Sequence, residues 1–191
     1  MRCGAGELWV ENAASNDVSV LDVGSGQAAG PPIPVGQPPG AIAAFETTVW
    51  VANAGDGTVM KIDTDQRQVV QTVHVGRDPD AITIGGGSAW VANASGGTVT
   101  RIDQSTGNVV DKAIQVGGSP NSMAFAEGSV WVADSRDAVR QIDANPGRVG
   151  PRIKVDHFPA AIGIDKGTVW VAAWSQRAPH YDGAPGTLDQ P

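Results

Sequence analysis

The chain has 191 residues, a formal net charge of −7 and one cysteine, Cys3. A single cysteine excludes an intrachain disulfide framework and a multi-cysteine metal cage, and no apolar run approaches the roughly 20 residues that span a bilayer. The acidic balance, without a stripe of clustered Lys and Arg, argues against nucleic acid as a partner, because phosphate binding needs such a stripe.

The N-terminal segment M-R-C-G-A-G-E-L has no apolar core of the kind found in a secretory signal peptide. When Trp9 is aligned with Trp90, Met1 and Cys3 fall opposite Ile82 and Ile84, inside a strand. We therefore expect Cys3 to be a small core residue rather than a reactive thiol, and the chain to start partway through a repeat.

A tryptophan recurs every 39 to 41 residues, each time in a short apolar run. The runs are L-W-V-E-N (8–12), V-W-V-A-N (49–53), A-W-V-A-N (89–93), V-W-V-A-D (130–134) and V-W-V-A-A (169–173). A fixed period of this length is typical of repeat proteins. Because both alternating faces of each run are apolar, we expect a middle strand buried on both sides. The predicted structural core therefore contains Trp9, Trp50, Trp90, Trp131 and Trp170.

The segment 79–117 shows one complete repeat. Strands are predicted at 79–84, 89–93, 98–103 and 108–117, separated by short turns rich in Gly, Ser and Asn. No stretch has helical apolar spacing over a useful length. Asp63 and Asp103 follow third strands, where a carboxylate commonly accepts backbone N–H groups in an Asx turn. Short connections between neighbouring strands predict a four-stranded antiparallel meander.

A repeated meander of about 40 residues is a β-propeller blade, so we predict an all-β propeller. The expected domain is 1–174, with a partial blade 1–36, blades 37–76, 77–117 and 118–156, and a half blade 157–174. A Pro/Gly-rich tail or linker follows at 175–191, because A-P-H-Y-D-G replaces the third strand expected near 178–183. Three hypotheses for the ring remain: a fragment of a larger propeller, a small four- or five-bladed ring, or open arcs that self-associate through their blade edges.

The combination of W-V-A-N, T-V-x-x-I-D and V-G-x-x-P-x-A-I resembles the YVTN β-propeller family over roughly residues 1–173. The resemblance implies a bacterial, periplasmic or extracellular propeller that forms part of a larger protein. It implies a non-catalytic binding or scaffolding role on one rim. The pattern lacks the G-H and W-D motifs of WD repeats, which makes that class less favoured.

The usual binding rim of the family combines the loops before first strands with the loops between second and third strands. That rim would contain Asp56, Ser95, Ser119, Asp137 and Phe158, and the candidate ligand-binding residues Arg77, Asp78, Asp80, Asn121, Arg136 and His157. These positions vary between repeats while the framework is constant, which is typical of a functional surface. The expected ligand is a protein, a glycan or a small molecule.

An enzyme is the main alternative. The tryptophan-bearing strands also resemble propeller lyases of the streptogramin type, which use a metal and a catalytic histidine near the central channel; His157 alone lies on the matching rim. No H-x-H, H-E-x-x-H or C-x-x-C spacing is present, so no metal site, cofactor or catalytic residue is assigned. A third hypothesis is a truncated fragment without activity of its own.

Overall fold

The computed structural model describes residues 6–110 and 112–174, which form five antiparallel sheets. We call them blades 1 to 5 in chain order. The strands are β1 (Glu7–Asn12), β2 (Asp17–Asp22) and β3 (Ile33–Pro34); β4 (Pro39–Phe45), β5 (Thr48–Asn53), β6 (Thr58–Asp63) and β7 (Gln68–His74); β8 (Pro79–Gly85), β9 (Ser88–Asn93), β10 (Thr98–Asp103) and β11 (Ile114–Gln115); β12 (Pro120–Ala126), β13 (Ser129–Asp134), β14 (Ala138–Asp143) and β15 (Ile153–Lys154); and β16 (Phe158–Asp165) and β17 (Thr168–Trp174). The all-β propeller fold is confirmed. The predictions for Met1, Cys3 and 175–191 lie outside the described residues.

The first three strands of each complete blade follow the apolar alternation of the sequence. In blade 3, β9 pairs with β8 on one side and β10 on the other, and Trp90 lies opposite Thr83 and Arg101. The turns after the third strands are Asx turns, as predicted. Asp63 Oδ1 accepts the N–H of Gln66 at 2.8 Å, and Asp103 Oδ1 accepts the N–H of Thr106 at 2.8 Å.

The fourth strands are the part of the blade that sequence alternation predicts least well. The strand expected at 108–117 is only Ile114–Gln115, with an isolated bridge between Val109 and Ile102. An outermost strand pairs on one side only, so its loss costs a single ladder of hydrogen bonds. Among the described fourth strands, only β7 keeps seven residues. The corresponding segments of blades 1 and 4 contain Pro31, Pro32 and Pro151, which cannot donate to a ladder.

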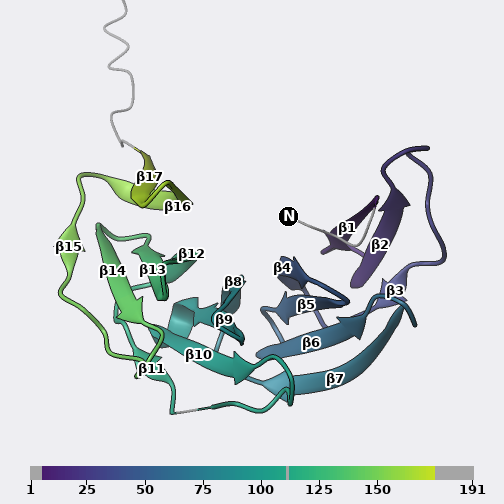
Figure 1. The fold of residues 1–191 in the computed structure, drawn as a ribbon, viewed down its shortest axis with the longest axis horizontal. Helices are drawn as coiled ribbons and strands as arrows, with labels where there is room; N and C mark the ends of the chain where they lie inside the picture. The colour runs from purple at the N-terminus through teal and green to yellow at the C-terminus, as the bar shows by residue number, and fades with distance from the viewer. Residues whose placement is uncertain (1–5, 111, 175–191) are drawn as a thin grey trace, which may run out of the picture.

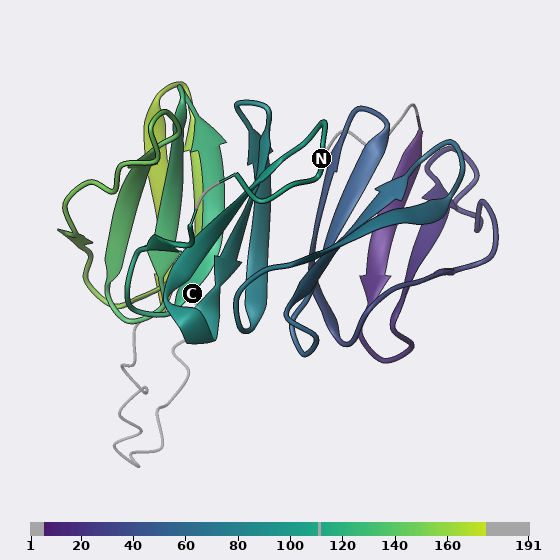
Figure 2. The same ribbon diagram turned by 90° about the horizontal axis from the view of Figure 1, so that it is seen from below.

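The blades lie side by side around an open arc, with β1, β4, β8, β12 and β16 on the inside (Figure 1). Seen from the side, the strands run between two rims of loops (Figure 2). Across the described residues the ring is not closed: blade 1 and blade 5 stand at opposite ends of the arc (Figure 1).

Neighbouring blades pack face to face through the recurring tryptophan. Trp9 packs on Val49, Val51 and Ile62 of blade 2; Trp50 packs on Ala89, Val91 and Ile102 of blade 3; Trp90 packs on Val130, Val132 and Ile142 of blade 4. These three indoles are at most 2% exposed. Each one therefore points toward the next blade in the chain, and the apolar face that receives it belongs to that next blade.

Two basic side chains add to this packing. Lys61 lies over the Trp50 ring at 5.3 Å from its centroid, and Arg101 lies over the Trp90 ring at 5.0 Å. Both then reach the next blade, where Lys61 Nζ donates to the carbonyl of Gln104 and Arg101 to the carbonyl of Ala144, each at 2.8 Å. Cation–π contact and charge-assisted hydrogen bonds thus join blades 2, 3 and 4.

Candidate functional site

The loops that precede first strands and the loops that join second to third strands lie at the same end of each blade. We call this end the proline rim, because Pro39, Pro79 and Pro120 begin the first strands there. One backbone hydrogen bond joins the two loops in each of blades 2, 3 and 4. The pairs are Ala54 N–H to the Pro38 carbonyl (2.8 Å), Ala94 to Asp78 (2.8 Å) and Ser135 to Ser119 (3.0 Å). The loop backbone is therefore held in the same way three times.

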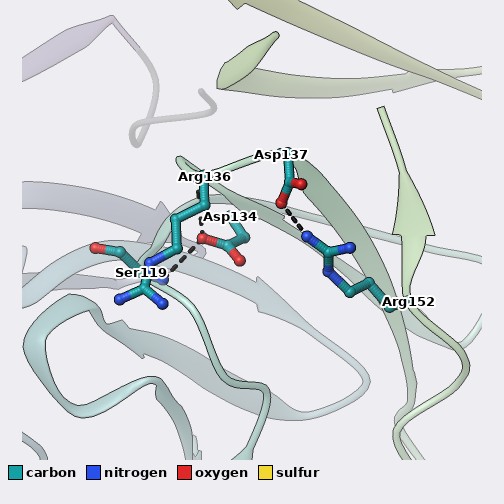
Figure 3. A network of polar contacts seen from close by, with 5 residues as sticks. All are labelled: Ser119, Asp134, Arg136, Asp137 and Arg152. Carbon is teal, nitrogen blue, oxygen red and sulfur yellow. Dashed lines mark hydrogen bonds and ion pairs between the residues drawn. The ribbon is translucent and has the colours of Figure 1, made fainter. Parts of the chain in front are cut away.

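Side-chain bonds between these loops differ from blade to blade. In blade 2, the Gln37 N–H donates to Asp56 Oδ2 at 2.8 Å; in blade 3, the Ser95 hydroxyl donates to Asp78 Oδ2 at 2.9 Å. In blade 4, Asp134 Oδ1 accepts the backbone N–H groups of Ser119 (2.8 Å) and Arg136 (3.1 Å) (Figure 3). The chemistry of the rim thus varies on a constant backbone.

Buried asparagines at the ends of the second strands form hydrogen bonds next to the rim loops. Asn93 is fully buried; its amide donates to the hydroxyls of Thr98 and Thr100 at 3.0 Å, and its Oδ1 accepts the Gly76 N–H at 3.0 Å. Asn53 occupies the same place in blade 2 and donates to Thr58 at 3.1 Å. This asparagine was not among the predicted site residues, although its recurrence at the end of W-V-A-N indicated a structural role.

Asp80 and Asn121, both predicted ligand-binding residues, are the bulged residues of the innermost strands β8 and β12. The pairing register shifts between Pro79 and Ala81 and again between Pro120 and Ser122. A bulge releases one residue from the ladder and redirects its side chain. Asn121 uses this freedom to donate to the Pro159 carbonyl of blade 5 at 2.9 Å.

The pKa of Asp80 is raised, first because its carboxyl is partly buried and second because Asp78 carries a like charge nearby. Both effects disfavour the charged form. The rim of blade 3 therefore holds two carboxylates whose mutual repulsion a donor or a cation would relieve.

The charged side chains predicted at the rim differ in whether they form ion pairs. Asp137 forms an ion pair with Arg152, a residue that our sequence analysis did not select (Figure 3). Arg77 and Arg136 are exposed, and within the described residues neither guanidinium forms an ion pair. These two arginines are therefore available to an external acceptor.

His157 lies at the rim of blade 5, exposed and with a left-handed φ of 75°; Asp78 has a similar φ of 59°. Both residue types tolerate this conformation better than most. Among the residues that the structure describes, no three His, Cys, Asp or Glu side chains gather in a metal-binding arrangement.

Two hollows lie at the opposite rim. One of about 610 Å³ is lined by Arg101, Phe125, Glu127 and Asn145, and one of about 440 Å³ by Gln141, Arg148 and Pro151. None of the six predicted ligand-binding residues lines either hollow. The structure thus separates the variable polar rim from these two cavities.

Comparison with known proteins supports the fold and nothing finer. No family model matches the chain, and no curated protein matches it. No helix in the described residues is long and apolar enough to cross a membrane.

Solved structures do match. The computationally designed Ika8 protein superposes with a TM-score of 0.76 at 17% identity, over 90% of this chain and 54% of that one. BamB from Moraxella catarrhalis superposes with a TM-score of 0.72 at 13% identity, over 91% of this chain and 54% of that one. Hydrazine synthase from Kuenenia stuttgartiensis superposes with a TM-score of 0.70 at 21% identity, over 82% of this chain and 48% of that one. The chain spans about half the length of these neighbours, which include propellers. At these identities the likeness shows the fold alone.

Proposed function

We propose that this propeller module is non-catalytic and binds a protein, glycan or small molecule on its proline rim. The observation that supports this most is the threefold recurrence of one loop-to-loop hydrogen bond beneath side chains that differ in every blade. A loop backbone that is held before the ligand arrives loses less conformational entropy on binding.

The chemistry of the rim favours a ligand with an anionic group and hydrogen-bond donors. Arg77 and Arg136 are exposed guanidinium groups, which pair well with carboxylate, sulfate or phosphate. Asp78 and Asp80 are acceptors on the same rim. An acidic glycan or a peptide carrying both charges would meet both requirements.

The cellular setting belongs to the same proposal. The likeness of the repeats to the YVTN family supports a bacterial, periplasmic or extracellular protein in which this arc is one part.

The experiment is a screen of the labelled protein against a glycan array and a peptide array, followed by calorimetric titration of the best probe. Arg77→Ala and Arg136→Ala should each weaken binding by about tenfold or more, since a charged hydrogen bond is worth on the order of 1.5–3 kcal/mol. The matched control is Arg148→Ala, which removes an exposed arginine from the opposite rim. Equal weakening by the control, or unchanged affinity in both rim variants, would contradict the proposal.

A further inference from the structure

One face of blade 5 is apolar and uncovered in the described residues. On β17, Trp170, Ala172 and Trp174 alternate onto the same side, and their partners on β16 are Gly163, Ala161 and Phe158. All six are exposed, with Trp170 at 65% and Trp174 at 72%. We call this surface the indole face. Its other side, with Ile162, Ile164, Val169 and Val171, is partly buried.

The opposite end of the arc has a second uncovered apolar surface. Leu8 and Val10 of β1 alternate with the buried Trp9, and Leu8 pairs with Leu21 of β2. Leu8 is 40% exposed, and Val10 and Leu21 are partly exposed. We call these three residues the aliphatic face.

The interfaces between neighbouring blades within the arc show which kind of surface each of these two faces contacts. The equivalents of Leu8, Val10 and Leu21 are Val49, Val51 and Ile62 in blade 2, which are fully buried under Trp9 of blade 1. The same arrangement recurs under Trp50 and under Trp90. In all three interfaces the tryptophan-bearing face of one blade packs on the aliphatic side chains of the next blade, and no two tryptophan-bearing faces pack on each other.

We propose that the indole face of one copy of this chain binds the aliphatic face of a second copy, head to tail. A single arc holds both faces but keeps them at its two separated ends (Figure 1), so it cannot join them to each other. A second copy supplies the missing partner to each. The proposal concerns blade faces and not the rim, so it is independent of the ligand-binding proposal.

The size of the surface is compatible with such an interface. Each tryptophan can bury about 150–250 Å², and Trp170 and Trp174 are 65% and 72% exposed. Together they can therefore supply roughly a quarter to two fifths of the roughly 800 Å² per partner of a standard interface. Because the contact is heterologous, one free face of each kind remains in every pair, and assembly continues until the copies close or stop. The net charge of −7 per chain opposes it, so salt should strengthen the association by screening.

The test is sedimentation velocity of the full chain between about 1 and 200 μM. The wild type should associate with rising concentration, and more strongly in 0.5 M salt. Trp170→Lys and Leu8→Lys should each lower the apparent association constant by about tenfold or more, since central apolar contacts dominate interface energies. Val70→Lys is the control, because Val70 is a comparably exposed apolar residue on the outer strand β7. Circular dichroism checks that each variant is folded.

Mixing gives the decisive result. Trp170→Lys keeps its aliphatic face and Leu8→Lys keeps its indole face, so the mixture should form one-to-one pairs that stop at two chains. Association of Leu8→Lys alone at wild-type strength would overturn the proposal in favour of indole-to-indole pairing. A wild type that stays monomeric across the range, or a mixture that does not pair, would also overturn it.

Discussion

Trp90 and Trp170 occupy the same register position in nearly identical strands, yet they have opposite surroundings. Trp90 is fully buried between blades 3 and 4, whereas Trp170 is 65% exposed. Trp90 also donates to the Gly85 carbonyl at 3.2 Å and lies under Arg101. The difference shows that the local sequence makes the strand, while the neighbouring blade decides whether its tryptophan stabilises the fold.

Trp131 is intermediate between these two cases. It is partly exposed, because the described part of blade 5 covers it with two strands, whereas blades 2 to 4 have four strands each. A small hollow of about 90 Å³ lies beside it, lined by Ile164 and Val169 among others. The burial of the recurring indole therefore decreases stepwise toward the end of the arc.

Replacing each tryptophan by alanine should separate the buried site from the exposed one. Trp90→Ala should cost about 3–5 kcal/mol in the free energy of unfolding, because it leaves a cavity between two sheets. Trp170→Ala, at low protein concentration, should cost at most about 1–2 kcal/mol, since only about a third of the side chain is buried. Denaturant titrations of both variants give the two values, and equal costs would contradict the account.

A second prediction concerns the cation above the ring. Arg101→Met should cost about 1–2 kcal/mol, because it removes the contact with Trp90 and the bond to the Ala144 carbonyl. In blade 4 the equivalent residue is Gln141, which is exposed and bonds Ser129. Gln141→Met should cost less, and thermal melts of the two variants at matched salt measure the difference. A larger loss from Gln141→Met would refute the role given to Arg101.

A third prediction compares the bulges of blades 3 and 4. Asp80→Asn should stabilise the fold by less than about 1 kcal/mol at pH 7, because it removes a charge that the site disfavours. It also introduces an amide like that of Asn121, which donates to the next blade. Since the folded pKa of Asp80 is raised, its charge costs stability above that pKa, and the advantage of the variant should vanish as the pH falls below about 4. A gain that persists at pH 3 would contradict this assignment.

The smallest expected effect concerns the Asx turn of blade 3. Hydrogen bonds from the side chain of Ser105, and then from the backbone and hydroxyl of Thr106, lower the pKa of Asp103 to about 2. A lowered folded pKa contributes stability above the unfolded value near 4 and loses it as the pH falls through about 2. Carboxyl-carbon NMR titration should give Asp103 a pKa well below the ordinary value near 4, and Ser105→Ala should raise that pKa. An unchanged pKa in that variant would exclude Ser105 as the main cause.

Much of the fold could be predicted because its determinants are local. The alternation in P-D-A-I-T-I, A-W-V-A-N and T-V-T-R-I-D and the turns between them locate β8, β9 and β10 within a residue or two. The Asx turns at Asp63 and Asp103 follow from the carboxylate and the residues just after it.

The features that depend on a partner could not be predicted in the same way. The bulges at Asp80 and Asn121 are set by the register of the adjoining strand. The sequence does not mark the shortening of β11 either, because its segment 108–116 contains no Pro or Gly. The sequence V-W-V-A is identical at 130–133 and at 169–172. The exposure of Trp170 depends on whether another blade packs on it, which these four residues do not encode. The ligand-binding role of Arg77, Asp78, Asp80, Asn121, Arg136 and His157 stays a prediction.

Fluorine NMR of the protein labelled with 5-fluorotryptophan can show whether the recurring indoles differ in burial according to the blade beside them. Each indole signal is assigned by single Trp→Phe replacement, and its broadening by a soluble paramagnetic agent reports its exposure. At low micromolar concentration the Trp50 and Trp90 signals should stay sharp, while those of Trp170 and Trp174 broaden; at high concentration the last two should become protected. A Trp170 signal as protected as that of Trp90 at the lowest concentration would contradict the account.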